Sequence, residues 1–323
     1  MKKEVKATMA NKAHEEIPGN PSVSTSSEQK LNDRSNGKPL RVLSLEEWEF
    51  WMHNGYIVIK NAIPKDQVKA TVDFLWEFDE KDPNDSSTWY AKPRAKMKMK
   101  ELAGTGMVEV YNHQTLWNNR QMQKVYDAFV DVWGTEKLWV TIDRVNLNFP
   151  QRPGEEKEGF IHWDYDPETR PQNVQGVIAL ADQMDPNMGG FQCIPWLYRN
   201  YNTWKLTQPE DRDRFKPNLE KLKDKLVKVV MEAGDLLIFN STEPHGIRPN
   251  RSGDKVRIAQ YISMMPAEEE NQKLKDWRVN SWKKRIAPEG FAFPGDPRSW
   301  EQKKHETAEL SELGKKLLGL NNW

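Results

Sequence analysis

The stretch Gly159-Phe-Ile-His162-Trp-Asp164-Tyr-Asp-Pro167 places an imidazole and a carboxylate two residues apart. On an extended strand, residues i and i+2 point to the same face, so His162 and Asp164 can approach one metal ion from one side. A third ligand must come from far along the chain, and the best candidate is His245 in Asn240-Ser-Thr-Glu-Pro-His245-Gly246. Two histidines and one carboxylate make a facial triad, which covers one side of an octahedral Fe(II) ion and leaves the opposite side open.

Apolar runs separated by turns surround this motif and predict the fold. They lie at residues 176–181, 191–194, 225–231 and 236–239, and the last of them leads to His245. Strands in this order, with a distal histidine after the last one, are the layout of a double-stranded β-helix, also called a jelly roll. The sequence therefore predicts a mostly β protein with a cupin-like core at residues 138–265 and with helices on its N-terminal and C-terminal sides.

The composition argues against several classes of protein. The 323 residues carry a formal net charge of zero, whereas proteins that bind nucleic acid need a basic field. The chain has no run of about 18 apolar residues, so no membrane span is expected. A single cysteine, Cys193, allows no disulfide within the chain, which fits a reducing compartment. We therefore expect a cytoplasmic protein whose partner is a small molecule.

The ends of the chain are predicted to differ from its middle. Residues 1–40 are polar and cannot bury enough surface to offset the entropy of ordering, so we expect a disordered tail before one domain at residues 41–323. The first helix should begin at Ser44-Leu-Glu-Glu47, which has the pattern of a capping box. Residues 196–225 form an insertion between barrel strands, either a lid or a plain surface excursion. Residues 267–323 form a helical segment.

One apolar stripe in the C-terminal segment leaves two interpretations open. Leu310, Leu313, Leu317 and Leu320 recur at helical spacing within residues 306–320. The stripe packs a helix onto the barrel, or it forms the seam of a homodimer. The sequence does not fix the oligomeric state.

The strand expected at residues 138–149 changes its apolar phase partway along. Alternate apolar positions run to Ile142 and resume in the other phase at Val145. The strand therefore contains a bulge, or its two faces exchange roles. Beyond the change, Arg144, Asn146 and Asn148 share one face. They line the site if that face looks into the barrel, and they meet solvent if it does not.

An arginine on the closing strand is the candidate for binding an anion. Arg257 shares one face of residues 256–263 with Tyr261 and Ser263. A guanidinium forms two parallel hydrogen bonds to a carboxylate, so a dicarboxylate co-substrate is one partner and a structural salt bridge is the alternative. Arg248 and Arg251 lie in the turn after His245 and are expected to face solvent.

Tryptophans are numerous, and two of them lie where a substrate could be bound. The chain has 14 tryptophans, which fill the core or line an apolar pocket. Trp163 lies between the two metal-ligand candidates, and Trp196 begins the insertion. These two are the candidates for contact with a substrate.

Taken in order, these motifs resemble the phytanoyl-CoA dioxygenase family of Fe(II)/2-oxoglutarate oxygenases. The resemblance covers most of residues 42–265 and rests on Gly55-Tyr-Ile-Val-Ile, His-x-Asp164, Gly-Asp235-Leu-Leu-Ile-Phe, Pro-His245-Gly and the arginine of the closing strand. It implies that His162, Asp164 and His245 bind iron and that Arg257 binds the distal carboxylate of 2-oxoglutarate. Asn146 and Asn148 are further candidates for contact with the co-substrate.

The resemblance also has departures and rivals. The hydroxyl residue often found two positions after the distal histidine is Ile247 here, and Pro195-Trp196-Leu197 replaces a common Gly-Ser-His. The implied reaction consumes O2 and 2-oxoglutarate, releases succinate and CO2, and hydroxylates a small organic metabolite. A zinc hydrolase built on the same three ligands is one rival, and it needs a nearby general base but no Arg257. A jelly-roll binding protein without turnover is the other.

Overall fold

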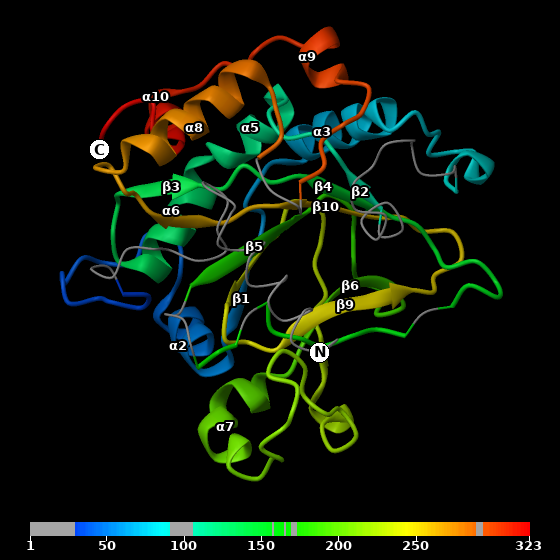
Figure 1. Cartoon of the computed structure of the whole chain (residues 1–323), viewed down its shortest axis with the longest axis vertical. Coiled ribbons are helices and arrows are strands. Elements are labelled where there is room, and N and C mark those ends of the chain that lie inside the picture. The colour runs from blue at the N-terminus through cyan, green and yellow to red at the C-terminus, as the bar shows by residue number, and fades with distance from the viewer. Residues whose placement is uncertain (1–29, 91–105, 157, 165, 169–172, 289–292) are drawn as a thin grey trace.

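The computed structural model describes residues 30–90, 106–156, 158–164, 166–168, 173–288 and 293–323 (Figure 1). Its strands form antiparallel sheets. The larger sheet has the order β1-β8-β5-β10-β4-β2, and a three-stranded sheet has the order β7-β6-β9. The strands of these two sheets are β1 (Tyr56–Ile59), β2 (Met107–Val108), β4 (Val145–Asn148), β5 (Val174–Ala179), β6 (Met188–Cys193), β7 (Val227–Lys228), β8 (Leu236–Asn240), β9 (His245–Asn250) and β10 (Arg257–Tyr261).

The two sheets enclose a small apolar interior. Val177, Leu237 and Ala259 from the larger sheet pack in one cluster with Phe191 and Met231 from the side of the smaller sheet. Period-2 alternation along each strand places such residues on the inner face. This arrangement is the double-stranded β-helix expected from the sequence, a mostly β fold with flanking helices.

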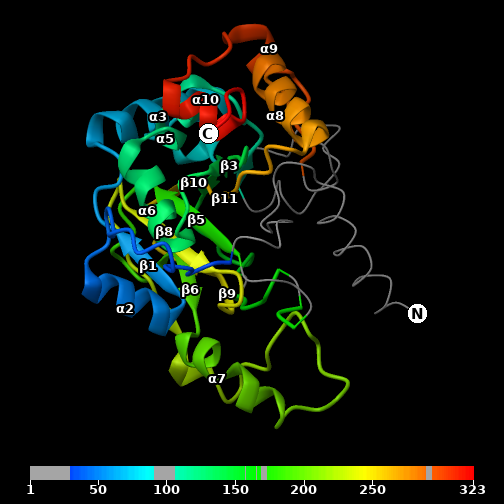
Figure 2. The same cartoon turned by 90° about the vertical axis from the view of Figure 1, so that its left-hand side faces the viewer.

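Helices cover the outer face of the larger sheet and one end of the molecule (Figure 2). The described helices are α2 (Leu45–Asn54), α3 (Lys65–Phe78), α5 (Gln114–Arg120), α6 (Gln123–Trp133), α7 (Pro195–Lys205), α8 (Gln272–Lys284), α9 (Trp300–Lys304) and α10 (Glu312–Leu318). Helix α2 begins with the expected capping box, because Ser44 accepts from the Glu47 N–H and Glu47 accepts from the Ser44 N–H. None of the helices in the described ranges is long and apolar enough to cross a membrane.

The strand expected at residues 138–149 is two strands in different sheets. β3 (Leu138–Val140) pairs with β11 (Met264–Pro266), whereas β4 pairs with β10 and β2. The chain leaves one ladder and enters the other between residues 141 and 144. The change of apolar phase therefore marks a break between strands, and a bulge within one strand was the wrong interpretation.

The expected disordered tail does not extend to residue 40. Residues 1–29 lie outside the described residues, but from residue 30 onward the chain contacts the body. The Asn32 backbone N–H donates to the Val132 carbonyl oxygen at 2.9 Å, and the Trp51 indole N–H donates to Asn32 Oδ1 at 2.7 Å. Arg34 donates to the Asp131 carbonyl oxygen at 3.2 Å. Leu31 and Leu40 also pack against the main core, so polar contacts and two apolar side chains together hold this segment in place.

The insertion at residues 196–225 lies beyond the end of the barrel, around α7 (Figure 1). Its Trp204 and Leu222 pack with Ile161 and Trp163 in a cluster of their own.

The C-terminal stripe of leucines is shorter than expected, since α10 covers only residues 312–318. Leu317 is buried there and α10 contacts β3, whereas Leu320 lies beyond the helix and is exposed. The stripe therefore packs a helix onto the body of the protein.

Candidate metal centre

An antiparallel backbone bridge brings the two candidate histidines together. The His162 N–H donates to the His245 carbonyl oxygen at 2.8 Å, and the His245 N–H donates to the His162 carbonyl oxygen at 3.0 Å. The imidazole centroids are consequently 5.0 Å apart. Asp164 follows two residues after His162, and one ligand atom from each of the three side chains lies within 4.8 Å of the others. The structure thus groups all three residues that the sequence selected.

Charge and hydrogen bonds hold Asp164 as a carboxylate. Its oxygens lie 3.1 Å from His162 Nε2 and 3.6 Å from His245 Nε2, and one of them accepts from the Gln175 amide. Burial acts to raise the pKa of this carboxyl, but the hydrogen bond to His162, the two imidazoles and Gln175 together hold the pKa well below its usual range. Gln175 was not singled out from the sequence. Its position on β5, facing the interior, becomes clear only from the pairing of the strands.

His245 is a neutral imidazole, and its hydrogen bonding shows which ring nitrogen carries the proton. Burial lowers its pKa to about 4, so it carries no charge near neutral pH. Its Nδ1 lies 2.9 Å from the Glu243 carbonyl oxygen, which can only accept a hydrogen bond. The proton is therefore on Nδ1, and the lone pair is on Nε2, beside Asp164. This tautomer is the one that a metal ligand requires.

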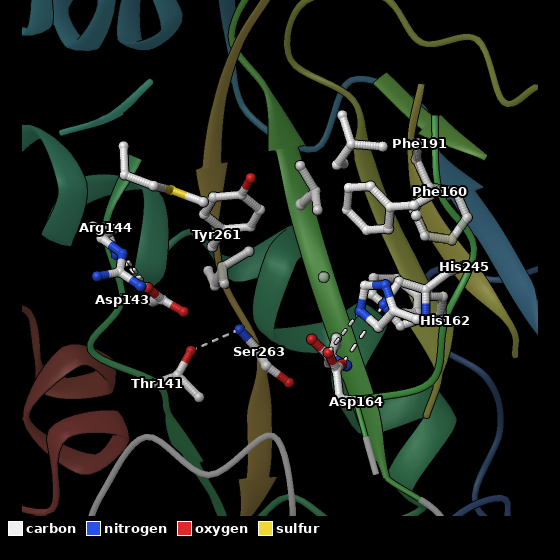
Figure 3. Close-up of a pocket in the computed structure, with 18 of the residues that line it drawn as sticks. Thr141, Asp143, Arg144, Phe160, His162, Asp164, Phe191, His245, Tyr261 and Ser263 are labelled. Atoms are coloured by element: carbon white, nitrogen blue, oxygen red, sulfur yellow. Dashed lines mark hydrogen bonds and ion pairs between the residues drawn. The ribbon is translucent and has the colours of Figure 1, made fainter. Parts of the chain in front are cut away.

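A cavity of about 320 Å³ opens in front of the three side chains (Figure 3). Phe160, Phe191 and Tyr261 line it, and Phe239 and Phe293 add further apolar surface. The donor set fits divalent iron, since imidazole and carboxylate are its ligands in sites of this type. The aromatic lining restricts access of water to whatever is bound there.

A polar wall lies across the cavity from the triad (Figure 3). Arg144 and Asp143 form it, together with Thr141 and Ser263, whose backbone N–H donates to the Thr141 hydroxyl at 2.8 Å. Arg144 makes an ion pair with the buried Glu109 at 3.2 Å. Of the three polar residues expected to share one strand face, only Arg144 lines the cavity; it lies in the connection before β4, whereas Asn146 and Asn148 lie within β4.

Arg257 is fully buried in the barrel and does not line the open cavity. Its Nε donates to Gln183 Oε1 at 3.2 Å, and its Nη1 donates to Asn146 Oδ1 at 3.1 Å. Among the described residues no carboxylate pairs with it, and its Nη2 has no hydrogen-bond partner. The alternative of a structural salt bridge is therefore wrong for this arginine within the described structure. A buried guanidinium that lacks a counter-charge fits an anionic ligand.

Arg248 was expected to face solvent, and the structure corrects this. It lies within β9 and is 1% exposed, because β9 extends through residue 250. Its Nη1 donates to the carbonyl oxygens of Phe191 and Val229. Arg251 does lie at the surface, where it pairs with the exposed Glu158 at 2.9 Å.

Of the four remaining candidates, the two asparagines lie beside Arg257 and the two tryptophans lie in a hydrophobic cluster. Asn146 contacts Arg257, and Asn148 is the residue paired with Arg257 across the β4–β10 ladder. Trp163 is 1% exposed and donates to the Thr242 carbonyl oxygen at 2.9 Å, so it is a core residue. Trp196 packs in the same cluster. Neither tryptophan lines the cavity, and the expected contact with substrate is therefore not supported for either.

Comparison with known proteins gives a consistent set of relatives. The family model described as Phytanoyl-CoA dioxygenase (PhyH) matches residues 51–259. "Ava biosynthesis cluster protein O" of Aspergillus versicolor is 27% identical over 68% of this chain and 77% of its own length. A "Putative phytanoyl-CoA dioxygenase" of Dictyostelium discoideum is 24% identical over 85% of this chain and 86% of its own. The solved structure of GlcNAc Inducible Gene 2 from Candida albicans shares the fold, with a TM-score of 0.62 at 14% identity, covering 99% of this chain and 83% of that one.

Proposed function

This chain belongs to the phytanoyl-CoA dioxygenase family, and we propose that it uses Fe(II), 2-oxoglutarate and O2 to hydroxylate an unactivated C–H bond of a small organic metabolite. The observation that carries the proposal is the grouping of His162, Asp164 and His245 at a cavity, with their ligand atoms within 4.8 Å. Succinate and CO2 are the expected co-products.

In this proposal the three side chains hold iron from one side, and bound iron supplies the O2 chemistry that no protein side chain provides. The chain contributes orientation and exclusion of water. Glu243, through its carbonyl oxygen, fixes the tautomer of His245, and Gln175 orients Asp164. The aromatic residues of the cavity surround the open side, where a substrate C–H bond must lie close to the metal.

Arg257 is the proposed ligand for the distal carboxylate of 2-oxoglutarate. It is buried, it has an open N–H, and Asn146 and Gln183 orient its guanidinium group. A five-carbon keto diacid has a chelating end for the metal and a carboxylate for the arginine. A zinc hydrolase built on the same three ligands gives no reason for this buried cation.

Conversion of 2-oxoglutarate separates these functions. Purified protein with Fe(II) and O2 should convert 2-oxoglutarate to succinate and CO2, faster when a suitable metabolite is present. His162→Ala and His245→Ala should abolish this conversion, whereas Arg251→Ala, at the exposed pair with Glu158, should leave it unchanged. Full conversion by either histidine variant, or none by wild-type protein that has bound iron, would overturn the proposal.

A further inference from the structure

We infer that Arg248 is a second co-substrate-binding residue, which joins Arg257 and Gln183 in a two-guanidinium site for the distal carboxylate of the 2-oxo acid. The inference rests on the proposed function, since it concerns the co-substrate which that function consumes. Arg248 is on β9 of the smaller sheet and Arg257 is on β10 of the larger one, so the site joins the two sheets (Figure 1).

The guanidinium of Arg248 is anchored on one side and open on the other. Its Nη1 donates to the carbonyl oxygens of Phe191 at 2.5 Å and Val229 at 2.9 Å. Its Nε and Nη2 are buried and have no partner among the described residues. These two nitrogens form the edge of the guanidinium that takes both oxygens of a carboxylate in parallel hydrogen bonds. If Arg248 only held the strands together, its Nη1 hydrogen bonds would suffice. That role gives no reason for burying Nε and Nη2 without partners.

The open atoms around Arg248 are nearly all donors. The donors are Nε and Nη2 of Arg248, Nη2 of Arg257 and the side-chain amide nitrogen of Gln183. The amide oxygen of Gln183 already accepts a hydrogen bond from Arg257. Asn148 Oδ1 is the one open acceptor nearby in the described structure, on the residue paired with Arg257. A carboxylate offers about four lone-pair sites and no donor, so it complements this set.

A glycine leaves room where these groups converge. A Cβ on Gly190 would stand 2.8 Å from Gln183 Oε1 and 3.0 Å from Arg248 Nη2, so the two groups flank one point. Gly190 has φ +102, which other residues rarely adopt. Gly190 therefore keeps a side chain out of the space between the amide and the guanidinium.

The charge of the cluster points to the same class of ligand. Burial, and next the charge of Arg257, lower the pKa of Arg248 to about 10, while Asp185 acts in the opposite direction. Arg248 therefore stays cationic at neutral pH. Within the described residues, the two arginines have no carboxylate in contact, and buried cations without a counter-ion are costly. The distal carboxylate of a 2-oxo diacid supplies that counter-ion.

The test compares two keto acids that share the chelating end. Protein loaded with Mn(II), which accepts the same ligands without turnover, is titrated calorimetrically with 2-oxoglutarate and with 2-oxobutanoate, which lacks the distal carboxylate. Arg248→Met should weaken 2-oxoglutarate roughly 30-fold or more and change 2-oxobutanoate by less than about threefold. Arg248→Lys should recover part of the loss, because a point charge replaces a forked donor. Arg251→Met, at the surface, is the matched control and should change neither affinity.

The outcomes separate the inference from the proposed function. If wild-type protein binds both acids equally, the co-substrate assignment itself fails. If Arg257→Met loses the preference for 2-oxoglutarate and Arg248→Met keeps it, the proposed function stands and the inference is wrong. An equal loss for both acids in Arg248→Met shows a structural role and also overturns it. If Arg248→Met does not fold, Arg248→Lys decides, since it keeps the charge: unchanged selectivity would reject the shared site.

Discussion

Replacing Glu301 by glutamine should remove a pH-dependent part of the stability of this fold. Glu301, on α9, is 3% exposed, and its carboxyl oxygens accept from the backbone N–H groups of Tyr111, at 2.9 Å, and Asn112. Burial raises its pKa to about 7, although these N–H donors and the charge of Arg120 act to lower it. The side chain thus fastens the C-terminal segment to the backbone just before α5, and its pKa lies near neutral pH.

The sign and size of the effect follow from the two pKa values. The folded state holds the Glu301 proton more tightly than the unfolded chain, whose pKa is near 4.5. The contribution to the free energy of unfolding is therefore full below pH 4.5 and is lost as the pH rises to about 7. Each pKa unit is worth about 1.4 kcal/mol, so on the order of 2–3 kcal/mol should disappear between pH 5 and pH 8.

Urea unfolding of wild-type protein and Glu301→Gln at both pH values measures this contribution. Between pH 5 and pH 8 the wild-type protein should lose on the order of 2–3 kcal/mol more than the variant, because glutamine does not titrate. Equal losses in the two proteins would show that Glu301 does not titrate in this range and would refute the reasoning.

Three further predictions concern the metal centre and the N-terminal segment. His245→Ala should leave the protein folded by circular dichroism but without stoichiometric iron in metal analysis; wild-type iron content would remove His245 from the ligand set. Gln175→Leu should weaken iron binding by about 10–100-fold in chelator competition, because Asp164 loses its orienting donor, and unchanged affinity would contradict this. A chain that begins at residue 41 should melt about 2–6 °C below one that begins at residue 30, because the contacts of Asn32 are lost; equal melting temperatures would show that these contacts contribute nothing.

The features that the sequence revealed are those encoded by short patterns. His162 and Asp164 are two residues apart on extended chain, and His245 follows the apolar strand β8. Each ligand could therefore be recognised from its neighbours in the sequence. The capping box at Ser44 is local in the same way. The inward direction of Tyr261 and Ser263 followed from the period of two along the closing segment, and both residues line the cavity.

The features that the sequence concealed depend on distant partners. The break between β3 and β4 could not be located, because a change of apolar phase looks the same in a bulged strand and in two strands of different sheets. Residues 30–40 contain few apolar residues, yet Leu31 and Leu40 pack against the core, and Asn32 and Arg34 hydrogen-bond to groups that are distant in the sequence. A low apolar content is therefore a poor guide to order where a few packed side chains act together with polar contacts.

Arg248 shows how a strand boundary changes the chemistry assigned to a residue. In a turn, its guanidinium would meet solvent and need no partner. Within β9, it lies opposite Gly190 of β6, and the absent side chain lets it enter the interior. Two adjacent glycines in a strand that faces an arginine therefore indicate a close approach, and the sequence contained that signal. If the two arginines share one carboxylate, loss of either should abolish the preference for a diacid, and the double variant should lose little more than each single variant.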